Sequence, residues 1–283
     1  IPSWDTKTRD MLLEASALDW SKISPAVFGA MFQSIMDREA RRNLGAHYTG
    51  EQNIEKLIKP LFLDELREEF EQVKRNRSKL EAFHDKLRSL TFFDPACGCG
   101  NFLVVTYRAL RELELDVLRV LHDSAQLSLD VNSLIKVDVD QFFGIEIEEF
   151  PARIAAVALW LTDHQMNMKV GEEFGMYFAR IPLQTTPHIH HGNALRIDWA
   201  QVVPKERLSY ILGNPPFRGK KEQDSHLMPN GSELRSLVLI RFRRASRWVS
   251  CGPLSLSWAV RFSLPIALFY GGARVEERLP FTA

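Results

Sequence analysis

Two transitions from an apolar run to a loop constrain the fold of this chain more than any other feature. The first lies in Thr91 to Phe102, where the apolar run ends on Asp94 and small residues lead to a helix predicted from about Asn101. The second lies in Ile211 to Phe217, where two prolines prevent the run from continuing as a central strand. Because ligands bind at the carboxyl ends of the strands in open α/β sheets, the two loops predict neighbouring parts of one site.

These loops resemble those of the S-adenosylmethionine-dependent amino-methyltransferases that modify adenine N6 in DNA. Asp94 to Gly100 (Asp-Pro-Ala-Cys-Gly-Cys-Gly) is similar to the cofactor loop, and Asn214 to Phe217 (Asn-Pro-Pro-Phe) to the catalytic loop. The cofactor loop comes first, which is the order of the gamma type. Gly45 to Thr49 (Gly-Ala-His-Tyr-Thr) resembles the segment that closes over the methionine end of the cofactor in that type. The resemblance implies the class I methyltransferase fold, a Rossmann-like open α/β sheet, preceded here by a helical region.

Residues between the loops are expected to complete the cofactor site. Glu146 ends a predicted buried strand and would accept hydrogen bonds from the ribose hydroxyls; a solvated acid at a helix start is the alternative. Asp94 and Glu146 lie much further apart than the roughly 20 positions of the nicotinamide fingerprint, which argues against a dehydrogenase. Gly192-Asn193-Ala194 resembles the segment that touches the adenine ring of the cofactor. The expected cofactor-binding residues are Tyr48, Thr49, Asp94, Pro95, Ala96, Cys97, Gly98, Gly100, Asn101, Phe102, Glu146, Ile147, Asn193 and Ala194.

The resemblance also implies how the chemistry proceeds. The side-chain oxygen of Asn214 and the carbonyl of Pro215 would accept hydrogen bonds from the amino group of the target adenine, so positioning is the main catalytic contribution. Phe217 would stack on an adenine flipped out of double-stranded DNA, with packing in the core as its alternative role. The expected catalytic residues are therefore Asn214, Pro215, Pro216 and Phe217.

Composition permits this interpretation without selecting it. The chain has 283 residues, of which 45% are hydrophobic, and its formal net charge is zero. Such values are typical of an ordinary globular protein, so a DNA-binding surface would have to be local. Candidate basic clusters are Arg38, Arg41 and Arg42, and Arg218, Lys220 and Lys221. The three cysteines fit a reducing cytoplasm better than a disulfide scaffold, so we expect a cytoplasmic protein.

Metal, nuclease and membrane functions are disfavoured. His188, His190 and His191 invite a metal reading, but alternation along a strand would point the last two in opposite directions, so no metal site is predicted. No nuclease set of carboxylates and a lysine is assignable, and we expect no DNA cleavage. The apolar segment from Gly252 to Tyr270 contains Arg261, whose burial at a bilayer centre would cost about 3 kcal/mol, so no membrane contact is expected.

Three parts are predicted along the chain. Residues 1–50 would form a helical connector that resembles the connector of large fused restriction-modification enzymes and ends in the Tyr-Thr segment. Residues 51–224 would form a partial methyltransferase core. Residues 225–283 form an atypical tail, with eight arginines and eight serines but neither lysine nor aspartate, whereas residues 1–224 contain twelve lysines. The tail carries no motif of the family, and an out-of-frame translation would explain it.

Two alternative functions stay open. The chain could be an inactive truncated remnant that binds cofactor or DNA at most, because specificity requires base-edge contacts from a recognition module. It could also be an amino-methyltransferase of RNA or of protein glutamine, because Asn-Pro-Pro loops occur in those enzymes as well.

Overall fold

The computed structural model describes residues 5–17, 24–25, 27, 49–122, 134–175, 186–204, 206–214, 240–241, 267–270 and 273–276. Its helices are α1 (Thr6–Ser16), α4 (Glu51–Ile58), η2 (Lys59–Leu63), α5 (Asp64–Val73), α6 (Arg77–Ser89), α7 (Asn101–Leu121), η4 (Val139–Gln141), α8 (Glu149–Phe174) and α9 (Trp199–Val202). Its strands are β1 (Phe92–Asp94), β2 (Phe142–Glu146), β3 (His188–His191), β4 (Tyr210–Ile211), β5 (Ile240–Arg241), β6 (Ala267–Tyr270) and β7 (Ala273–Glu276).

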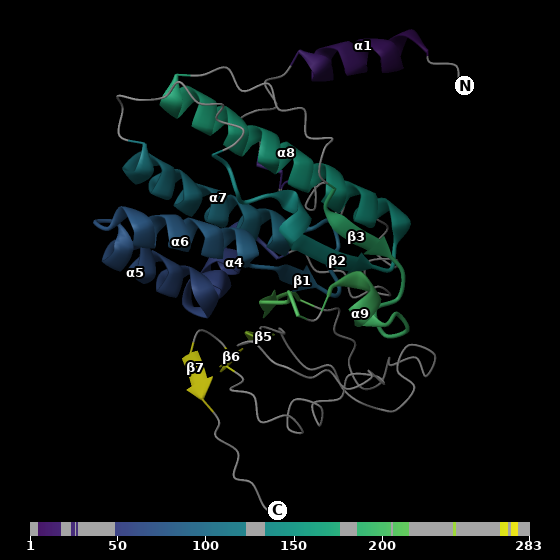
Figure 1. The fold of residues 1–283 in the computed structure, drawn as a ribbon. Coiled ribbons are helices and arrows are strands. Elements are labelled where there is room, and N and C mark those ends of the chain that lie inside the picture. The colour runs from purple at the N-terminus through teal and green to yellow at the C-terminus, as the bar shows by residue number, and fades with distance from the viewer. Residues whose placement is uncertain are drawn as a thin grey trace, which may run out of the picture.

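The central sheet has the strand order β3-β2-β1-β4-β5 (Figure 1). Its pairs are parallel except for β4 and β5, which run antiparallel. From β1 the chain builds through β2 to β3 on one side, and then β4 pairs with the other side of β1. This reversal creates a topological switch point between β1 and β4, the position at which open α/β sheets bind ligands. The predicted open sheet, preceded by helices, is confirmed.

Both faces of the sheet are covered, as its parallel strands require. The rings of Phe92, Phe142 and Tyr210 stack in a row, with ring centroids 5.2 Å apart, and pack into the larger hydrophobic core with residues of α4 to α8. Phe93 points to the opposite face, where its ring meets that of Trp199 of α9. The alternation follows from the period of two in a β-strand.

The helical segment directly before the sheet runs from the start of α4 to the end of α6. Its first part contains η2, a stretch of π-helix that includes Pro60. Proline lacks the N–H that an α-helical ladder needs, which accounts for the altered hydrogen bonding at this point. The side chain of Asn76 caps α6 by accepting a hydrogen bond from the N–H of Lys79 at 3.0 Å.

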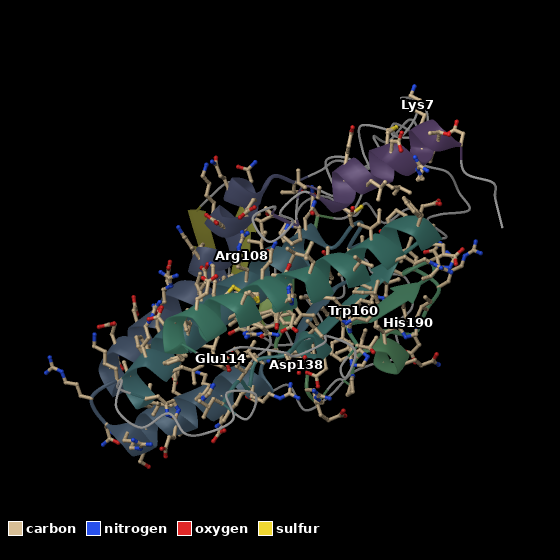
Figure 2. All side chains as sticks on the ribbon, turned by 90° about the horizontal axis from the view of Figure 1, so that it is seen from above. Lys7, Arg108, Glu114, Asp138, Trp160 and His190 are labelled. Carbon is tan, nitrogen blue, oxygen red and sulfur yellow. The ribbon has the colours of Figure 1, made fainter. Side chains whose placement is uncertain are left out.

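A buried ionic network joins α7 to α8. The guanidinium of Arg111 donates to the Tyr107 hydroxyl at 2.7 Å, to Asp163 at 2.8 Å and to Asn167 at 2.7 Å. Glu114, labelled in Figure 2, accepts backbone hydrogen bonds from residues 136 and 137 at 2.7 and 2.9 Å. The contacts of Arg111 hold α7 against α8, and those of Glu114 hold α7 against the segment before β2.

Within the described ranges, no helix combines the length and the apolar character that a bilayer crossing needs. The apolar segment considered above, residues 252–270, lies outside the described residues except for β6.

Candidate functional site

The loop after β1 is held in a tight turn by backbone contacts. The N–H of Cys97 donates to the carbonyl of Ile145 in β2 at 3.0 Å, and the N–H of Gly100 donates to the carbonyl of Cys97 at 2.8 Å. Gly98 and Gly100 have φ values of 56° and 82°, in the left-handed region that favours glycine. Gly100 also lies so close to α8 that an added Cβ would be 2.9 Å from the Cβ of Ala155. The turn leads directly into α7, which starts at Asn101 as predicted.

Glu146, at the end of β2, lies against this loop. One carboxylate oxygen accepts from the N–H of Gly98 at 2.8 Å, and the other accepts from the N–H of Glu148 at 3.1 Å. Burial raises the pKa of Glu146, and the two backbone hydrogen bonds oppose that shift. Each oxygen has a second lone pair, so the carboxylate can still accept hydrogen bonds from vicinal hydroxyls.

Asp94 lies beneath the end of β4. Its side chain is buried, and Oδ1 accepts from the N–H of Ala96 at 3.0 Å. Burial raises the pKa of Asp94 to about 8, and the nearby charge of Glu146 adds to the effect. Gly213 packs directly on this carboxyl group, because a Cβ at that position would lie 2.5 Å from Oδ1. The loop after β1 and the loop after β4 are therefore in contact at the switch point.

Asn214 follows Gly213, and its side chain meets the start of the helical region. Its Nδ2 donates to Oγ1 of Thr49 at 3.1 Å, across 165 positions of sequence. Two segments that were singled out separately, the Tyr-Thr segment and the Asn-Pro-Pro-Phe loop, thus touch through these two side chains. Tyr48, Pro215, Pro216 and Phe217 lie outside the described residues.

The segment after β3 lies beside Glu146 as well. The N–H of Gly192 donates to the backbone carbonyl of Glu146 at 2.7 Å. The side-chain oxygen of Asn193 accepts from the N–H of Leu195 at 2.9 Å, which leaves its amide NH₂ available to a ligand. The carbonyl of Ala194 accepts from the indole N–H of Trp199 at 2.9 Å. Residues 192–194 are thus fixed next to the acid expected to hold the ribose.

Two of the expected cofactor-binding residues, Phe102 and Ile147, differ from the others in their burial. Phe102 is only 4% exposed and packs in the larger hydrophobic core, because the second residue of α7 faces inward. Ile147 is 44% exposed, and its carbonyl contacts Nε2 of His191 at 3.0 Å. Pro95 and Ala96 in the loop and Asn101 at the start of α7 are half-buried, while Cys97 is buried.

The residues present fit S-adenosylmethionine. A helix start leaves its first N–H groups without intrahelical partners, and Gly100 supplies no side-chain cap to α7, so this end suits a carboxylate. The Oδ1 atom of Asn101 is buried without a hydrogen-bond partner and could accept from an ammonium group. Glu146 and Asn193 would serve the ribose and the adenine. The donors and acceptors of these residues thus match the carboxylate, the ammonium group and the nucleoside of the cofactor.

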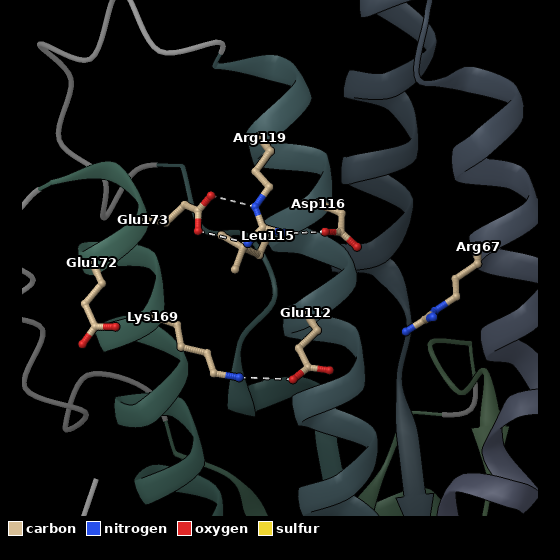
Figure 3. A pocket seen from close by; sticks show the side chains of 8 residues that line it. All are labelled: Arg67, Glu112, Leu115, Asp116, Arg119, Lys169, Glu172 and Glu173. Carbon is tan, nitrogen blue, oxygen red and sulfur yellow. Dashed lines mark hydrogen bonds and ion pairs between the residues drawn. The ribbon is translucent and has the colours of Figure 1, made fainter. Parts of the chain in front are cut away.

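The histidines around β3 and a groove between helices were also considered as sites. The described residues contain no group of three histidine, cysteine or acidic side chains arranged to hold a metal ion. His188 instead stacks on the ring of Phe143 at 4.4 Å. A charged groove lies between α5, α7 and α8, away from the switch point, and its rim contains ion pairs such as that between Arg119 and Glu173 (Figure 3). Its lining residues are Arg67, Glu112, Leu115, Asp116, Arg119, Lys169, Glu172 and Glu173.

Sequence reasoning missed two residues of this site. Gly213 allows the loop after β4 to rest on Asp94, and its place directly before Asn214 was the available signal. Gly144 allows close approach of Cys97, whose Sγ would lie 2.9 Å from an added Cβ. A single glycine within an apolar strand often marks such an approach.

Comparison with known proteins agrees with this arrangement. The model of the family described as "MmeI, DNA-methyltransferase domain" matches residues 70–239. DNA methyltransferase A of Bacillus subtilis (strain 168) is 40% identical over 225 residues, which are 78% of this chain and 25% of that protein. A solved structure of the Type IIL restriction-modification enzyme MmeI in complex with DNA is 66% identical, with a TM-score of 0.75, and the match covers 79% of this chain and 30% of that one. The chain therefore spans less than a third of the length of either relative, and the family match extends past residue 224, where the catalytic core was expected to end.

Proposed function

The chain belongs to the family of the MmeI DNA-methyltransferase domain, and from this premise we propose that it transfers a methyl group from S-adenosylmethionine to N6 of an adenine in double-stranded DNA. One observation carries the proposal. Asn214, in the loop after β4, lies across the switch point from the glycine loop after β1, so an amide acceptor stands beside the residues suited to the methyl donor. The MmeI neighbour is a complex with DNA, which supports DNA as the partner.

Each part of the pocket has one task in this proposal. When bound, the cofactor supplies an electrophilic methyl group. The cofactor would be held and oriented by the start of α7 and by the side chains of Asn101, Glu146 and Asn193. The Asn214 carbonyl oxygen, with that of Pro215, accepts hydrogen bonds from the adenine amino group and orients its nitrogen for attack. An adenine inside the duplex cannot reach this position, so the base must be flipped out, where Phe217 can stack on it.

The reaction needs no general base among these residues. The amine nitrogen would form its bond to the methyl carbon as the carbon–sulfur bond to that methyl group breaks, with the electron pair of that bond staying on sulfur, and the nitrogen would then release one of its two protons to solvent. Catalysis then depends on alignment, and a well-oriented pair of reactants can account for much of the rate enhancement. DNA and the methyl donor meet inside the cell, so we place the protein in the cytoplasm, where Cys97 and Cys99 stay reduced.

A methyl-transfer assay on the whole chain tests the proposal. DNA of mixed sequence is incubated with S-adenosylmethionine labelled on its methyl group, and the digested nucleosides are separated by mass spectrometry. We expect labelled N6-methyladenine with the parent chain and none with Asn214→Ala, which retains its cofactor affinity. Label on another base, on RNA or on protein glutamine would replace the proposed acceptor. Absence of transfer despite cofactor binding would favour an inactive remnant.

A further inference from the structure

We propose that Thr49 is a positioning residue that fixes the orientation of the Asn214 amide, so that its carbonyl oxygen and not its NH₂ group faces the substrate amine. The inference rests on the proposed function and adds a residue to it. The sequence assigned Thr49 to the methionine end of the cofactor, whereas the structure adds a hydrogen bond to the catalytic amide.

The contact engages one specific branch of the amide. Nδ2 of Asn214 donates to Oγ1 of Thr49 at 3.1 Å. An asparagine side chain has two N–H donors on one branch and a carbonyl acceptor on the other. Because the amide is planar, binding the NH₂ branch to Thr49 turns the carbonyl branch away from it. That branch is then available to a donor from outside.

The side-chain amide of Asn214 has little intrinsic preference between its two orientations. Rotation about the last torsion of an asparagine is broad and roughly two-fold, so both orientations are accessible when nothing holds the NH₂ group. The amino group of adenine offers N–H donors to the catalytic loop. A flipped amide would bring one NH₂ group against another and lose the acceptor. In this structure the hydroxyl oxygen of Thr49 accepts from the NH₂ group, and this contact holds the amide in the productive orientation before the base arrives.

The Thr49 side of the contact is firmly anchored. Glu51, two residues later, forms an ion pair with Arg108 of α7 and accepts from the Ser24 hydroxyl at 3.0 Å; Arg108 is labelled in Figure 2. Ile54 and Ile58 of the same helix, α4, are fully buried. The start of α4 therefore cannot move without disrupting the core, and Thr49 keeps its place.

The Asn214 side is anchored independently. The N–H of Leu212 donates to the carbonyl of Phe93 at 2.9 Å, which extends the pairing of β4 with β1. Gly213 rests on the buried carboxyl group of Asp94. Both partners thus belong to rigid parts of the fold, so the hydrogen bond can impose an orientation instead of following a mobile side chain.

Two substitutions separate this role from a purely structural one. Thr49→Val keeps the shape but has no hydroxyl, whereas Thr49→Ser keeps the hydroxyl. We expect kcat for DNA methylation to fall roughly 10- to 100-fold in Thr49→Val, as for other losses of catalytic alignment, and to stay near the parent value in Thr49→Ser. The KM for DNA and the calorimetric Kd for S-adenosylmethionine should change less than about threefold in both. A Thr49→Val protein with parental kcat overturns the inference, and so does one that loses cofactor affinity at unchanged kcat.

A second readout does not depend on turnover. In protein labelled with ¹⁵N-asparagine, the side-chain NH₂ signals of Asn214 are identified by their absence in Asn214→Ser. We expect them to shift in Thr49→Val and to stay in place in Thr49→Ser; unchanged signals in Thr49→Val contradict the contact. If the amide signals behave as expected but the parent chain transfers no methyl group to DNA, the proposed function fails and the positioning role toward an adenine amine fails with it.

Discussion

The backbone N–H of Gly98 donates to a carboxylate oxygen of Glu146 at 2.8 Å, so the acid expected to hold the ribose also closes the loop after β1. Glu146→Ala removes the hydrogen bond from Gly98 and the expected hydrogen bonds from the ribose. We therefore expect the affinity for S-adenosylmethionine to fall roughly 10- to 100-fold, as for lost hydrogen bonds to a charged group. Glu146→Gln keeps one acceptor oxygen and should lie between the parent and the alanine variant. Isothermal calorimetry gives the three Kd values.

The exposed neighbour Glu148 provides the control for this series, because Glu148→Ala leaves its backbone N–H and the carboxylate of Glu146 in place. Its affinity should equal that of the parent chain. Equal affinities for Glu146→Ala and the parent would mean that the cofactor does not use this carboxylate.

Two glycines with left-handed backbones test the packing of the cofactor loop. Gly100 has φ of 82° and would place a Cβ 2.9 Å from that of Ala155, whereas Gly175 has φ of 66° and meets nothing within 4 Å. Alanine costs about 1–2 kcal/mol at either position because of the backbone, but only Gly100→Ala adds overpacking of about 1–3 kcal/mol. Urea denaturation should therefore show a larger loss for Gly100→Ala, together with weaker cofactor binding. Equal losses in the two variants would show that the loop can move away from α8.

Protonation of Asp94 should make stability depend on pH. Burial raises its pKa from 3.8 to about 8, so between these values the folded protein keeps a proton that the unfolded chain has released. The contribution of this group to stability is complete below pH 3.8 and is lost as the pH rises toward 8, at up to about 1.4 kcal/mol per pH unit. The asparagine in Asp94→Asn cannot ionise. The free energy of unfolding of this variant should therefore increase relative to that of the parent chain as the pH rises through this range. Urea denaturation of both proteins at several pH values measures the difference, and parallel profiles would refute the raised pKa.

Local patterns in the sequence were sufficient to locate the two loops and the start of α7. Glycine and proline act on their own backbone and its neighbours, so Gly100 marks the turn before Asn101, and the prolines after Asn214 mark the end of β4. The open sheet was implied by the family resemblance that these two loops carry. The orientation of Phe102 could not be predicted, because the sequence does not state which way the first turn of α7 faces; its side chain packs in the larger hydrophobic core, and its role toward the cofactor stays a prediction.

Contacts between distant segments could not be predicted in this way. The bond between Thr49 and Asn214 joins residues 165 positions apart, and its existence depends on how α4 docks against the sheet. The ionic network is a similar case, because Arg111 and Asp163 are 52 positions apart and an arginine on a helix is usually solvated.

Arg111 should contribute far more to stability than an arginine that forms ion pairs at the surface of the same helix. Its side chain is fully buried between Asp163 and Glu114, at 2.8 and 3.1 Å, so Arg111→Met takes the guanidinium away from two buried carboxylates, of which only Glu114 keeps a contact with an imidazole, that of His84 at 2.8 Å. Breaking a buried pair in this way costs about 3–5 kcal/mol. Arg119 pairs with Glu173 and Asp116 while 46% exposed, and Arg119→Met should cost no more than about 1 kcal/mol because water screens such pairs. Urea denaturation compares the two variants. If both lost the same small amount, water would have to reach the carboxylates between α7 and α8, and the network would be solvated rather than part of the core.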